Sequence, residues 1–314
     1  MRMGRRGFFR FAATVVPAAA FGEEKAFAQR GGANACIPVH IPSRPSGVVE
    51  VVYKAPHGQP NELARGPNPG ELWVQDRGIG RQVTLIRAVD GSVIREITVD
   101  AIGPSGVTMD DDGVMWTADT HGVMLVAFDA STGATIAKYF VPGSCRVYEK
   151  QDDLPRRVSK LKLAYPDEKR AMGDNLKNNE GNDTGSGLGP GRVAPDTSHF
   201  WSGTGPAGLI AKGDLLIYSC LPARSIFTIR KKTWQVWPTP GNRALGLCWA
   251  DTKRTSFWCA EANLNTIYRY DAVTGEIRES IVLPEDAPVL HGCQIVNGYM
   301  YYTDDMGWIC RFKL

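Results

Sequence analysis

The chain ends with VLHGCQIVNGYMYYTDDMGWICRFKL (Val289–Leu314), a stretch that indicates three short strands and then stops. Apolar and aromatic runs separated by turns rich in Asp and Gly are typical of hairpins. Most domains do not finish on an exposed strand edge, because unpaired backbone groups invite other chains to pair. Two features therefore need an explanation: the strand that would complete this sheet, and the histidine, His291, at its start.

The same unit recurs earlier in the chain. Segments that begin at Pro60, Pro104, Pro206 and Arg243 each contain a first apolar strand, a turn and an aromatic second strand. The second strands are LWVQD, MWTAD, LLIYSC and FWCAE, and MYYTD in the closing segment. A period of about forty residues built from four strands is the pattern of a β-propeller blade. The sequence therefore predicts an all-β protein with a single β-propeller.

The closing segment has only three strands, and a fourth is available at the other end of the domain. GVVEVVYK (Gly47–Lys54) alternates like a strand and precedes the first complete unit. Pairing it with WICRFKL would close the ring and remove the exposed edge. Five blades are legible, whereas residues 144–204 lack the pattern and are long enough for a degenerate blade or for an excursion over one face. We predict six blades with a large surface insertion at 144–204.

The first residues have the form of an export signal. MRMGRRGFFRFAATVVPAAAFGEEKAFAQ contains the pair Arg5 and Arg6, a short apolar stretch, and an Ala-Phe-Ala end that signal peptidase accepts. It resembles a twin-arginine signal, which implies export in folded form through the Tat machinery to the periplasm or the exterior. An ordinary secretory signal would give the same compartment. The predicted division is a signal peptide (1–28), a linker (29–46) and a propeller domain (47–314).

Composition argues against several classes of partner. The net charge is only +3 over 314 residues, so nothing demands nucleic acid or an anionic membrane surface. The apolar stretch of the signal is too short to span a bilayer. The seven cysteines contain no C-x-x-C pair, which argues against a zinc knuckle or a thioredoxin-type motif. Five of the cysteines lie in apolar strand-like runs, and we expect them to be buried thiols that pack as small apolar residues.

The repeats resemble a known superfamily. VLHGCQIVNGYMYYTDD and RALGLCWADTKRTSFWCAEANLNTIYRYDAVTGE are similar to blades of the superfamily that holds virginiamycin B lyase, gluconolactonases and other NHL- or YVTN-type propellers. The resemblance implies the fold, but propellers of this kind host lyases, lactonases, dehydrogenases and binding modules. In the lyase, His and Glu side chains from several blades meet around a divalent metal at the mouth of the central channel.

The resemblance implies a site at the same mouth in this chain. His291 in LHG takes the histidine position, Glu261 in WCAE takes the glutamate position, and Asp304 in YYTD takes the equivalent place in its blade. Other residue types stand where further histidines would be expected: Asn61, Ser105, Ala207 and Leu245. A single histidine therefore remains, which is a departure from the lyase. The Glu-Gly-Pro segment of gluconolactonases is also absent, and Glu62 in PNEL is its nearest substitute.

Ligand chemistry points to a hard cation. The first residues of innermost strands converge in a propeller, so His291, Asn61 and Glu62 are expected to lie close together. One imidazole with carboxylates suits Mg²⁺ or Ca²⁺ better than zinc. The predicted metal ligands are Glu261, His291, Asp304 and Glu62. Glu261 and His291 also form the predicted acid/base pair. The alternative is that blade-end carboxylates accept hydrogen bonds from neighbouring backbone turns.

Loop residues are candidates for contacts with a substrate. His121 in ADTHGVM follows a second strand and a position at the channel mouth is expected for it. His199 lies in DTSHFWSG near Trp201, where an aromatic pair beside a Gly-rich hinge suits a lid. Together with Asn61 these three residues form the predicted substrate-binding set. The alternatives are a solvated loop for His121 and a packing patch for the other two.

Two classes of function follow from these residues. The first is an exported, metal-dependent enzyme, a lyase or hydrolase, that acts on a small ester, lactone or carbohydrate-like substrate. The second is a non-catalytic propeller whose rim binds a protein or glycan partner. A quinone-dependent dehydrogenase is less favoured, because no vicinal cysteine pair or repeated tryptophan docking motif is present. We favour the enzyme, with His291 and Glu261 as its catalytic residues.

Overall fold

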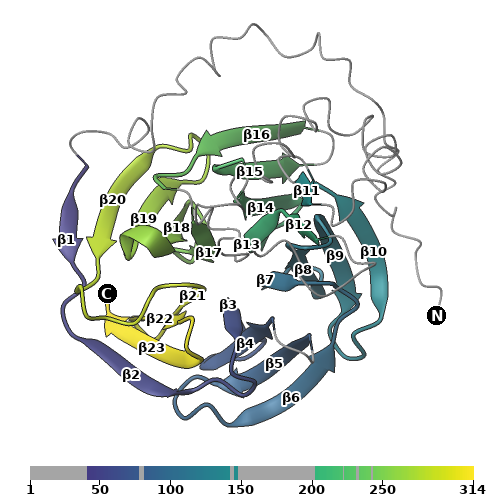
Figure 1. The fold of residues 1–314 in the computed structure, drawn as a ribbon, viewed down its shortest axis with the longest axis horizontal. Helices are drawn as coiled ribbons and strands as arrows, with labels where there is room; N and C mark the ends of the chain where they lie inside the picture. Colours follow the sequence, from purple (N-terminus) through teal and green to yellow (C-terminus); the bar gives the residue numbers. More distant parts are fainter. Residues whose placement is uncertain are drawn as a thin grey trace, which may run out of the picture.

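A computed structural model describes residues 41–77, 81–141, 145–147, 202–221, 223–230, 233–241 and 243–314. Five antiparallel β-sheets stand around a central axis as the blades of a propeller (Figure 1). No helix within these ranges has the length and apolar character needed to cross a membrane. The predicted signal peptide, most of the predicted linker and most of the 144–204 insertion lie outside the described residues.

Each blade has four strands that follow one another from the axis outward. Blade 1 comprises β3 (Pro60–Arg65), β4 (Glu71–Asp76), β5 (Gln82–Arg87) and β6 (Val93–Thr98). Blade 2 comprises β7 (Pro104–Met109), β8 (Val114–Asp119), β9 (Met124–Asp129) and β10 (Thr135–Phe140). Blade 3 comprises β13 (Pro206–Lys212), β14 (Leu215–Cys220), β15 (Ser225–Arg230) and β16 (Thr233–Pro238).

The last two blades contain the remaining long strands. Blade 4 comprises β17 (Ala244–Trp249), β18 (Ser256–Glu261), the short 3-10 helix η4 (Ala262–Leu264), β19 (Thr266–Asp271) and β20 (Ile277–Val282). Blade 5 comprises β21 (Cys293–Val296), β22 (Tyr299–Thr303), β23 (Trp308–Lys313) and β2 (Val49–Lys54). Outside the four-stranded pattern, β1 (Ser43–Pro45) runs parallel to β20, and β11 (Cys145–Val147) pairs with β12 (Ser202–Thr204).

The predicted closure of the ring is confirmed. Strand β2 pairs antiparallel with β23, with Val49 opposite Phe312 and Lys54 opposite Trp308. Across this pair Arg311 binds Glu50 at 2.7 Å. The strand from the start of the domain thus supplies the fourth strand of blade 5, and β23 is not left as an exposed edge.

The ring closes with five blades, which corrects the predicted count of six. The innermost strands contact one another in the order β3, β7, β13, β17 and β21, and β21 contacts β3 in turn. Strands β7 and β13 are therefore neighbours although residues 144–204 separate them in the sequence. No space remains for a sixth blade between these two innermost strands, because they are already in contact. The length of the insertion had favoured a sixth blade.

Glycines allow the innermost strands to approach the axis closely. Four of the five blades carry one at the equivalent position: Gly106, Gly208 and Gly246 are the third residues of β7, β13 and β17, and Gly292 directly precedes β21. A Cβ atom on Gly106 would lie 2.0 Å from the carbonyl oxygen of Ala207, and one on Gly246 would lie 2.5 Å from that of His291. The contacting atoms belong to the backbone of the next blade, so no side-chain rotation could relieve such a clash. The fifth innermost strand carries Glu62 at this position.

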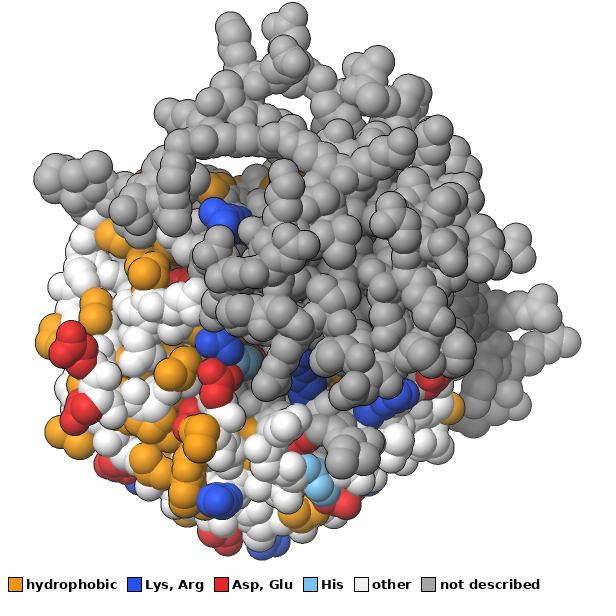
Figure 2. Space-filling view, in the orientation of Figure 1, with side chains coloured by type: hydrophobic (Ala, Val, Ile, Leu, Met, Phe, Trp, Pro, Cys, Tyr) orange, Lys and Arg blue, Asp and Glu red, His pale blue; other side chains and the backbone are white. Residues whose placement is uncertain are grey.

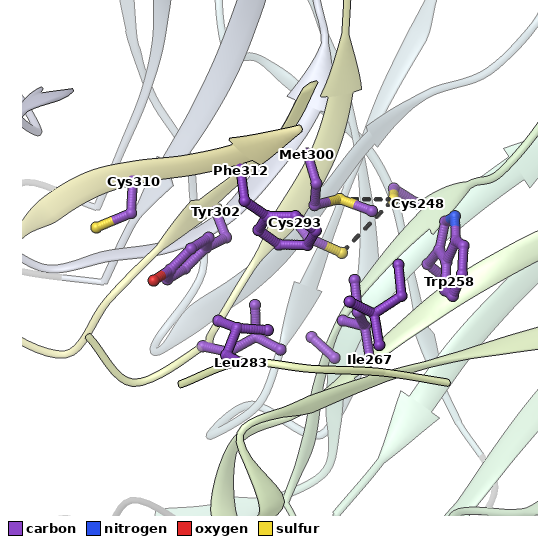
Figure 3. Packing of buried hydrophobic residues seen from close by; sticks show 12 residues of the cluster. Cys248, Trp258, Ile267, Leu283, Cys293, Met300, Tyr302, Cys310 and Phe312 are labelled. Atoms are coloured by element: carbon purple, nitrogen blue, oxygen red, sulfur yellow. Dashed lines mark hydrogen bonds between the residues drawn. The ribbon is translucent and has the colours of Figure 1, made fainter. Parts of the chain in front are cut away.

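Apolar side chains fill the spaces between neighbouring blades. The cluster between blades 4 and 5 includes Cys248 of β17, with Cys293 and Met300 of β21 and β22 (Figure 3). The Sγ atoms of Cys248 and Cys293 lie 3.5 Å apart. All five cysteines whose side chains the structure describes are free and buried, which confirms the expectation that they pack as small apolar residues.

Candidate active site at the channel mouth

One rim of the ring collects the residues that the sequence singled out. The first residue of an innermost strand pairs with the last residue of the second strand, as in Pro60 with Asp76 and Ala244 with Glu261. In blade 5 the N–H of His291 donates to the carbonyl of Thr303 at 2.9 Å. These strand ends and the loops beside them form one edge of the propeller, which we call the site rim.

His291 on this rim forms a pair with Asp305. The Nε2 atom of His291 lies 2.8 Å from Oδ1 of Asp305, while the side chain as a whole is almost fully buried. The Nδ1 atom is buried and has no hydrogen-bond partner among the described residues. A carboxylate only accepts hydrogen bonds, so we assign the ring proton to Nε2. The Nδ1 atom then carries a lone pair that no described residue uses in a hydrogen bond.

Arg243 links the two predicted catalytic residues. Its backbone N–H donates to both carboxylate oxygens of Glu261, at 2.9 and 3.1 Å. Its Nη2 atom lies 3.1 and 3.2 Å from the two oxygens of Asp305 and 3.3 Å from Nε2 of His291. Glu261 therefore holds the backbone of Arg243, and the Arg243 guanidinium reaches the His291–Asp305 pair. Glu261 acts on His291 through this residue.

The electrostatics of the pair keep Asp305 charged. Burial alone would raise the pKa of its carboxyl group. The hydrogen bond from His291 and the charge of Arg243 outweigh burial and hold this pKa well below its usual range. Asp305 is thus a permanent anion near neutral pH, and it fixes the orientation of the His291 ring.

Arg77 and His121 form a second contact on the site rim. The Nη2 atom of Arg77 donates to Nε2 of His121 at 2.6 Å. Burial, and then the charge of Arg77, lower the pKa of His121 to about 3, so the ring is a neutral acceptor. Burial and the nearby charge of Arg243 lower the pKa of Arg77, whereas Asp305 raises it. Arg77 therefore lies within electrostatic reach of the Arg243–Asp305 group.

The loop that carries His121 is held by a blade-end carboxylate. Asp119 accepts hydrogen bonds from the backbone N–H groups of Ile102, Gly103 and Gly122 at 2.8 to 2.9 Å. A Cβ on Gly103 would lie 2.6 Å from the His121 ring, so glycine is required for the ring to pack there. The predicted position of His121 on the rim is thus the result of close local packing.

Glu62 lies deeper, on the axis of the ring. Its carboxylate accepts hydrogen bonds from the N–H groups of Leu63 at 3.1 Å, Cys293 at 3.0 Å and Leu247 at 3.2 Å. Cys293 and Leu247 belong to the innermost strands of blades 5 and 4. Burial raises the pKa of Glu62 well above its usual value. Glu62 therefore ties three innermost strands together across the axis.

Two further predicted residues make structural contacts. Asn61 donates from Nδ2 to Oγ of Ser105 at 3.2 Å, between the innermost strands of blades 1 and 2. Asp304 accepts hydrogen bonds from the N–H groups of Met306 at 3.0 Å and Trp308 at 2.6 Å, and so stabilises the turn before β23. The other two members of the predicted substrate-binding set, at positions 199 and 201, lie outside the described residues.

Each of the four predicted metal ligands has a partner in the protein. Within the described ranges, no group of three or more His, Cys, Asp or Glu residues is arranged to hold a metal ion. The carboxylates of Glu62, Glu261 and Asp304 face backbone N–H donors, as the alternative interpretation expected. At His291 the nearest cationic group is the guanidinium of Arg243. A metal ion there would have to compete with this positive charge.

Sequence reasoning missed Arg77, Arg243 and Asp305. Each directly adjoins a position that the repeat had marked: Arg77 follows LWVQD, Asp305 follows YYTD, and Arg243 precedes ALGL. The repeat indicates which residues end a second strand, and the residue one step beyond lies on the same rim. Inspecting these flanking positions for charge would have found all three.

Glu261 leads to a prediction for the pH dependence of stability. Burial raises the pKa of its carboxyl group from 4.5 to about 7, against the lowering effect of the N–H groups of Arg243 and Asn263. Its contribution to the free energy of unfolding is therefore fully present below about pH 4.5 and is lost as the pH rises through 7. Glu261→Gln removes this titration, so the variant should gain about 2–3 kcal/mol relative to the parent between pH 5 and pH 8. Urea unfolding of both proteins at pH 5 and at pH 8 measures the difference in their free energies of unfolding. The same difference at both pH values would contradict the raised pKa of Glu261.

The five four-stranded sheets around one axis define the class of the protein as a five-bladed β-propeller, and a polar cluster lies on one rim of it. No protein-family model matches the chain, and no curated protein matches it in sequence. Similarity is found among solved structures.

Glutaminyl cyclase from Myxococcus xanthus is 10% identical with a TM-score of 0.51, and the match covers 87% of this chain and 97% of that one. A catalytically inactive virginiamycin B lyase from Staphylococcus aureus, solved with quinupristin, is 16% identical with a TM-score of 0.42. That match covers 81% of this chain and 66% of the lyase chain. A streptogramin B lyase is 14% identical with a TM-score of 0.41, covering 85% of this chain and 87% of that one. The predicted likeness to virginiamycin B lyase is thus found again, and at these identities it is a likeness of fold.

Proposed function

We propose that this propeller is an exported enzyme, a lyase or hydrolase, that moves a proton in a small ester, lactone or carbohydrate-like substrate at the channel mouth. The observation that carries the proposal is the His291–Asp305 pair, at 2.8 Å, with the Nδ1 atom of His291 left without a partner in the described part of the chain. A buried polar atom without a partner costs free energy, and a catalytic role is one explanation for retaining such an atom.

The chemistry follows from the roles of three side chains. Asp305 holds His291 in the tautomer whose Nδ1 lone pair is available, and it stabilises the imidazolium that forms when Nδ1 takes a proton. Arg243 donates to Asp305 and lies beside the ring, so its charge favours an oxyanion or enolate that develops next to His291. Glu261 positions Arg243 through the backbone and does not itself contact His291.

The proposal assigns no step to a divalent metal ion. The carboxylates predicted as ligands are engaged with N–H donors, and the Arg243 guanidinium supplies positive charge beside His291. Elemental analysis of protein purified without chelators, with melting temperatures before and after EDTA, tests this point. One equivalent of Mg²⁺ or Ca²⁺ whose removal lowers the midpoint would support the predicted metal site.

Substitution of the pair tests the activity. With a substrate found by screening esters, lactones and sugar acids for product formation, His291→Ala should lower kcat about 10²- to 10⁴-fold, the usual contribution of a general base. Asp305→Asn should lower kcat as well, because the amide no longer fixes the tautomer. His57→Ala is the matched control, since His57 pairs with Glu96 at a partly exposed position elsewhere. Full activity in the His291→Ala variant would refute the proposal.

A binding module is the second candidate. It is favoured by the blade-end carboxylates, which are occupied with backbone N–H groups as in a purely structural rim. In that case ligands would bind at the site rim without turnover, and His291→Ala would change affinity only.

A further inference from the structure

We infer that the substrate carries a carboxylate group, which the guanidinium groups of Arg77 and Arg243 bind at the channel mouth beside His291. This inference rests on the proposed function and names the class of its substrate. It starts from the charges that the loops of blades 1, 4 and 5 bring together on the site rim.

Positive charge is in excess in this group. Arg243 pairs with Asp305, which is the carboxylate that also holds His291. Arg77 contacts the neutral ring of His121, and no ion pair joins it to a carboxylate among the described residues. Asp305 is therefore the one fully charged carboxylate that the described residues place beside the two guanidinium groups, because burial raises the pKa of Glu261, which also lies within electrostatic reach of Arg243, to about 7. A partly buried cation without its own counter-charge is unfavourable, and an anionic ligand would relieve that cost.

Both guanidinium groups retain donors for such a ligand. A guanidinium has five N–H donors in a planar fork that matches the two oxygens of a carboxylate. Within the described residues, the contacts of Arg77 and Arg243 on this rim use Nη2. Figure 2 shows basic and acidic side chains together with a histidine near the middle of one face of the ring.

His121 prepares Arg77 for this role. A short contact of 2.6 Å holds one end of the guanidinium, and the low pKa of His121, about 3, keeps the ring a neutral acceptor. A charged histidine at this place would repel Arg77 instead. The fold thus fixes the direction of the Arg77 fork without neutralising its charge. His121 is a positioning residue for Arg77.

A substrate carboxylate bound to Arg77 and Arg243 determines which carbon of the substrate loses its proton. The carbon next to a carboxylate becomes more acidic when cations neutralise the carboxylate charge. His291 Nδ1 would take the proton from this carbon as the C–H bond breaks. The electron pair forms a carbon–carbon double bond, and the bond from the adjacent carbon to its oxygen substituent breaks. The leaving oxygen then takes the proton back from His291. Atoms and charge balance, so the reaction is β-elimination from a hydroxy or alkoxy acid such as a uronate.

Ligand binding tests the inference without relying on turnover. Isothermal titration calorimetry would compare three acids with their neutral partners: galacturonate with galactose, glucuronate with glucose, and lactate with lactamide. We expect at least one acid to bind ten-fold or more tightly than its neutral partner. Arg77→Gln and Arg243→Gln should each weaken that binding about 10- to 100-fold, the usual effect of losing hydrogen bonds to a charged group. Inorganic phosphate is the probe for an anion site without selectivity.

Arg254→Gln is the matched control. Arg254 lies in blade 4, as Arg243 does, but in the turn between β17 and β18 on the opposite rim, where it pairs with Asp111 at 2.7 Å. This variant should bind the acids as the parent does. Comparable melting temperatures of the three arginine variants would show that they are folded.

Several outcomes would overturn the inference. These are equal binding of acid and neutral partner, unchanged affinity in Arg77→Gln, phosphate binding as tight as that of the acids, or no binding of any acid. A turnover assay of the parent protein separates this inference from the proposed function. Retained acid binding with arginine dependence, but no turnover by the parent protein, would support the carboxylate site and reject the enzyme.

Discussion

Deletion of residues Val48 to Tyr53 is expected to abolish cooperative folding of the whole domain. These residues form most of β2, the strand that completes blade 5. Without β2, the backbone groups of β23 lose their partners and the last strand of the domain becomes an exposed edge. In a ring each blade packs against two neighbours, so the loss spreads to both interfaces of blade 5.

Side chains of β2 add to this effect. Val49 packs against the buried cluster between blades 4 and 5. Tyr53 packs against the cluster that joins blades 5 and 1, and its hydroxyl donates to the carbonyl of Ala88 in blade 1 at 3.0 Å. A short strand at the start of the domain therefore contacts three of the five blades. The free energy of unfolding lost with this ladder of hydrogen bonds and these apolar contacts exceeds the usual total stability of a domain, about 5–15 kcal/mol.

The deletion has a matched control at the other outer strand. Strand β1 also adds to the edge of a blade, but it runs parallel to β20 and its three residues are exposed. Deleting residues 41–45 should leave one cooperative transition with a modest loss of stability. Circular dichroism and urea unfolding of both truncated proteins measure the contrast. A cooperative transition in the β2 deletion, weakened by less than about 2 kcal/mol, would contradict the role of ring closure.

Gly106→Ala is expected to destabilise the domain by more than about 4 kcal/mol, a loss seen only with severe steric or packing faults. The added Cβ atom would lie 2.0 Å from the carbonyl oxygen of Ala207 and 3.0 Å from the backbone nitrogen of Leu209. Both contacts are with the backbone of β13, so relief requires blades 2 and 3 to move apart. That movement would open the closely packed axis of the ring.

Gly113→Ala in the same blade is the control for this substitution. Gly113 has a φ of +79° in the turn between β7 and β8, and an added Cβ would meet nothing within 4 Å. Its cost should be that of backbone strain alone, about 1–2 kcal/mol. Urea midpoints of the two variants give the comparison. Equal losses would show that the close approach of the innermost strands does not limit the fold.

Much of the fold could be predicted from the sequence, because the features that define a blade are local. Alternating apolar residues, aromatic second strands and turn residues recur with a fixed period, and each unit forms its sheet mainly from its own strands. The pairing of Gly47–Lys54 with the C-terminal strand could also be predicted, since an unpaired edge needs a partner. The count of blades was wrong, because the length of 144–204 gave no information on whether β7 and β13 are neighbours.

For the site, the sequence by itself determined which rim carries the polar residues and that His291 is the one histidine at the start of an innermost strand. Only the tertiary structure decided that Arg77, Arg243 and Asp305 gather there from different blades, that Glu261 holds Arg243, and that Glu62 accepts hydrogen bonds from Leu247 and Cys293 of blades 4 and 5. The physical reason is distance along the chain. The periodicity of the sequence predicts how a strand pairs with the strands next to it in the chain. Hydrogen bonds and charges act through space, between loops that come together only when the ring closes.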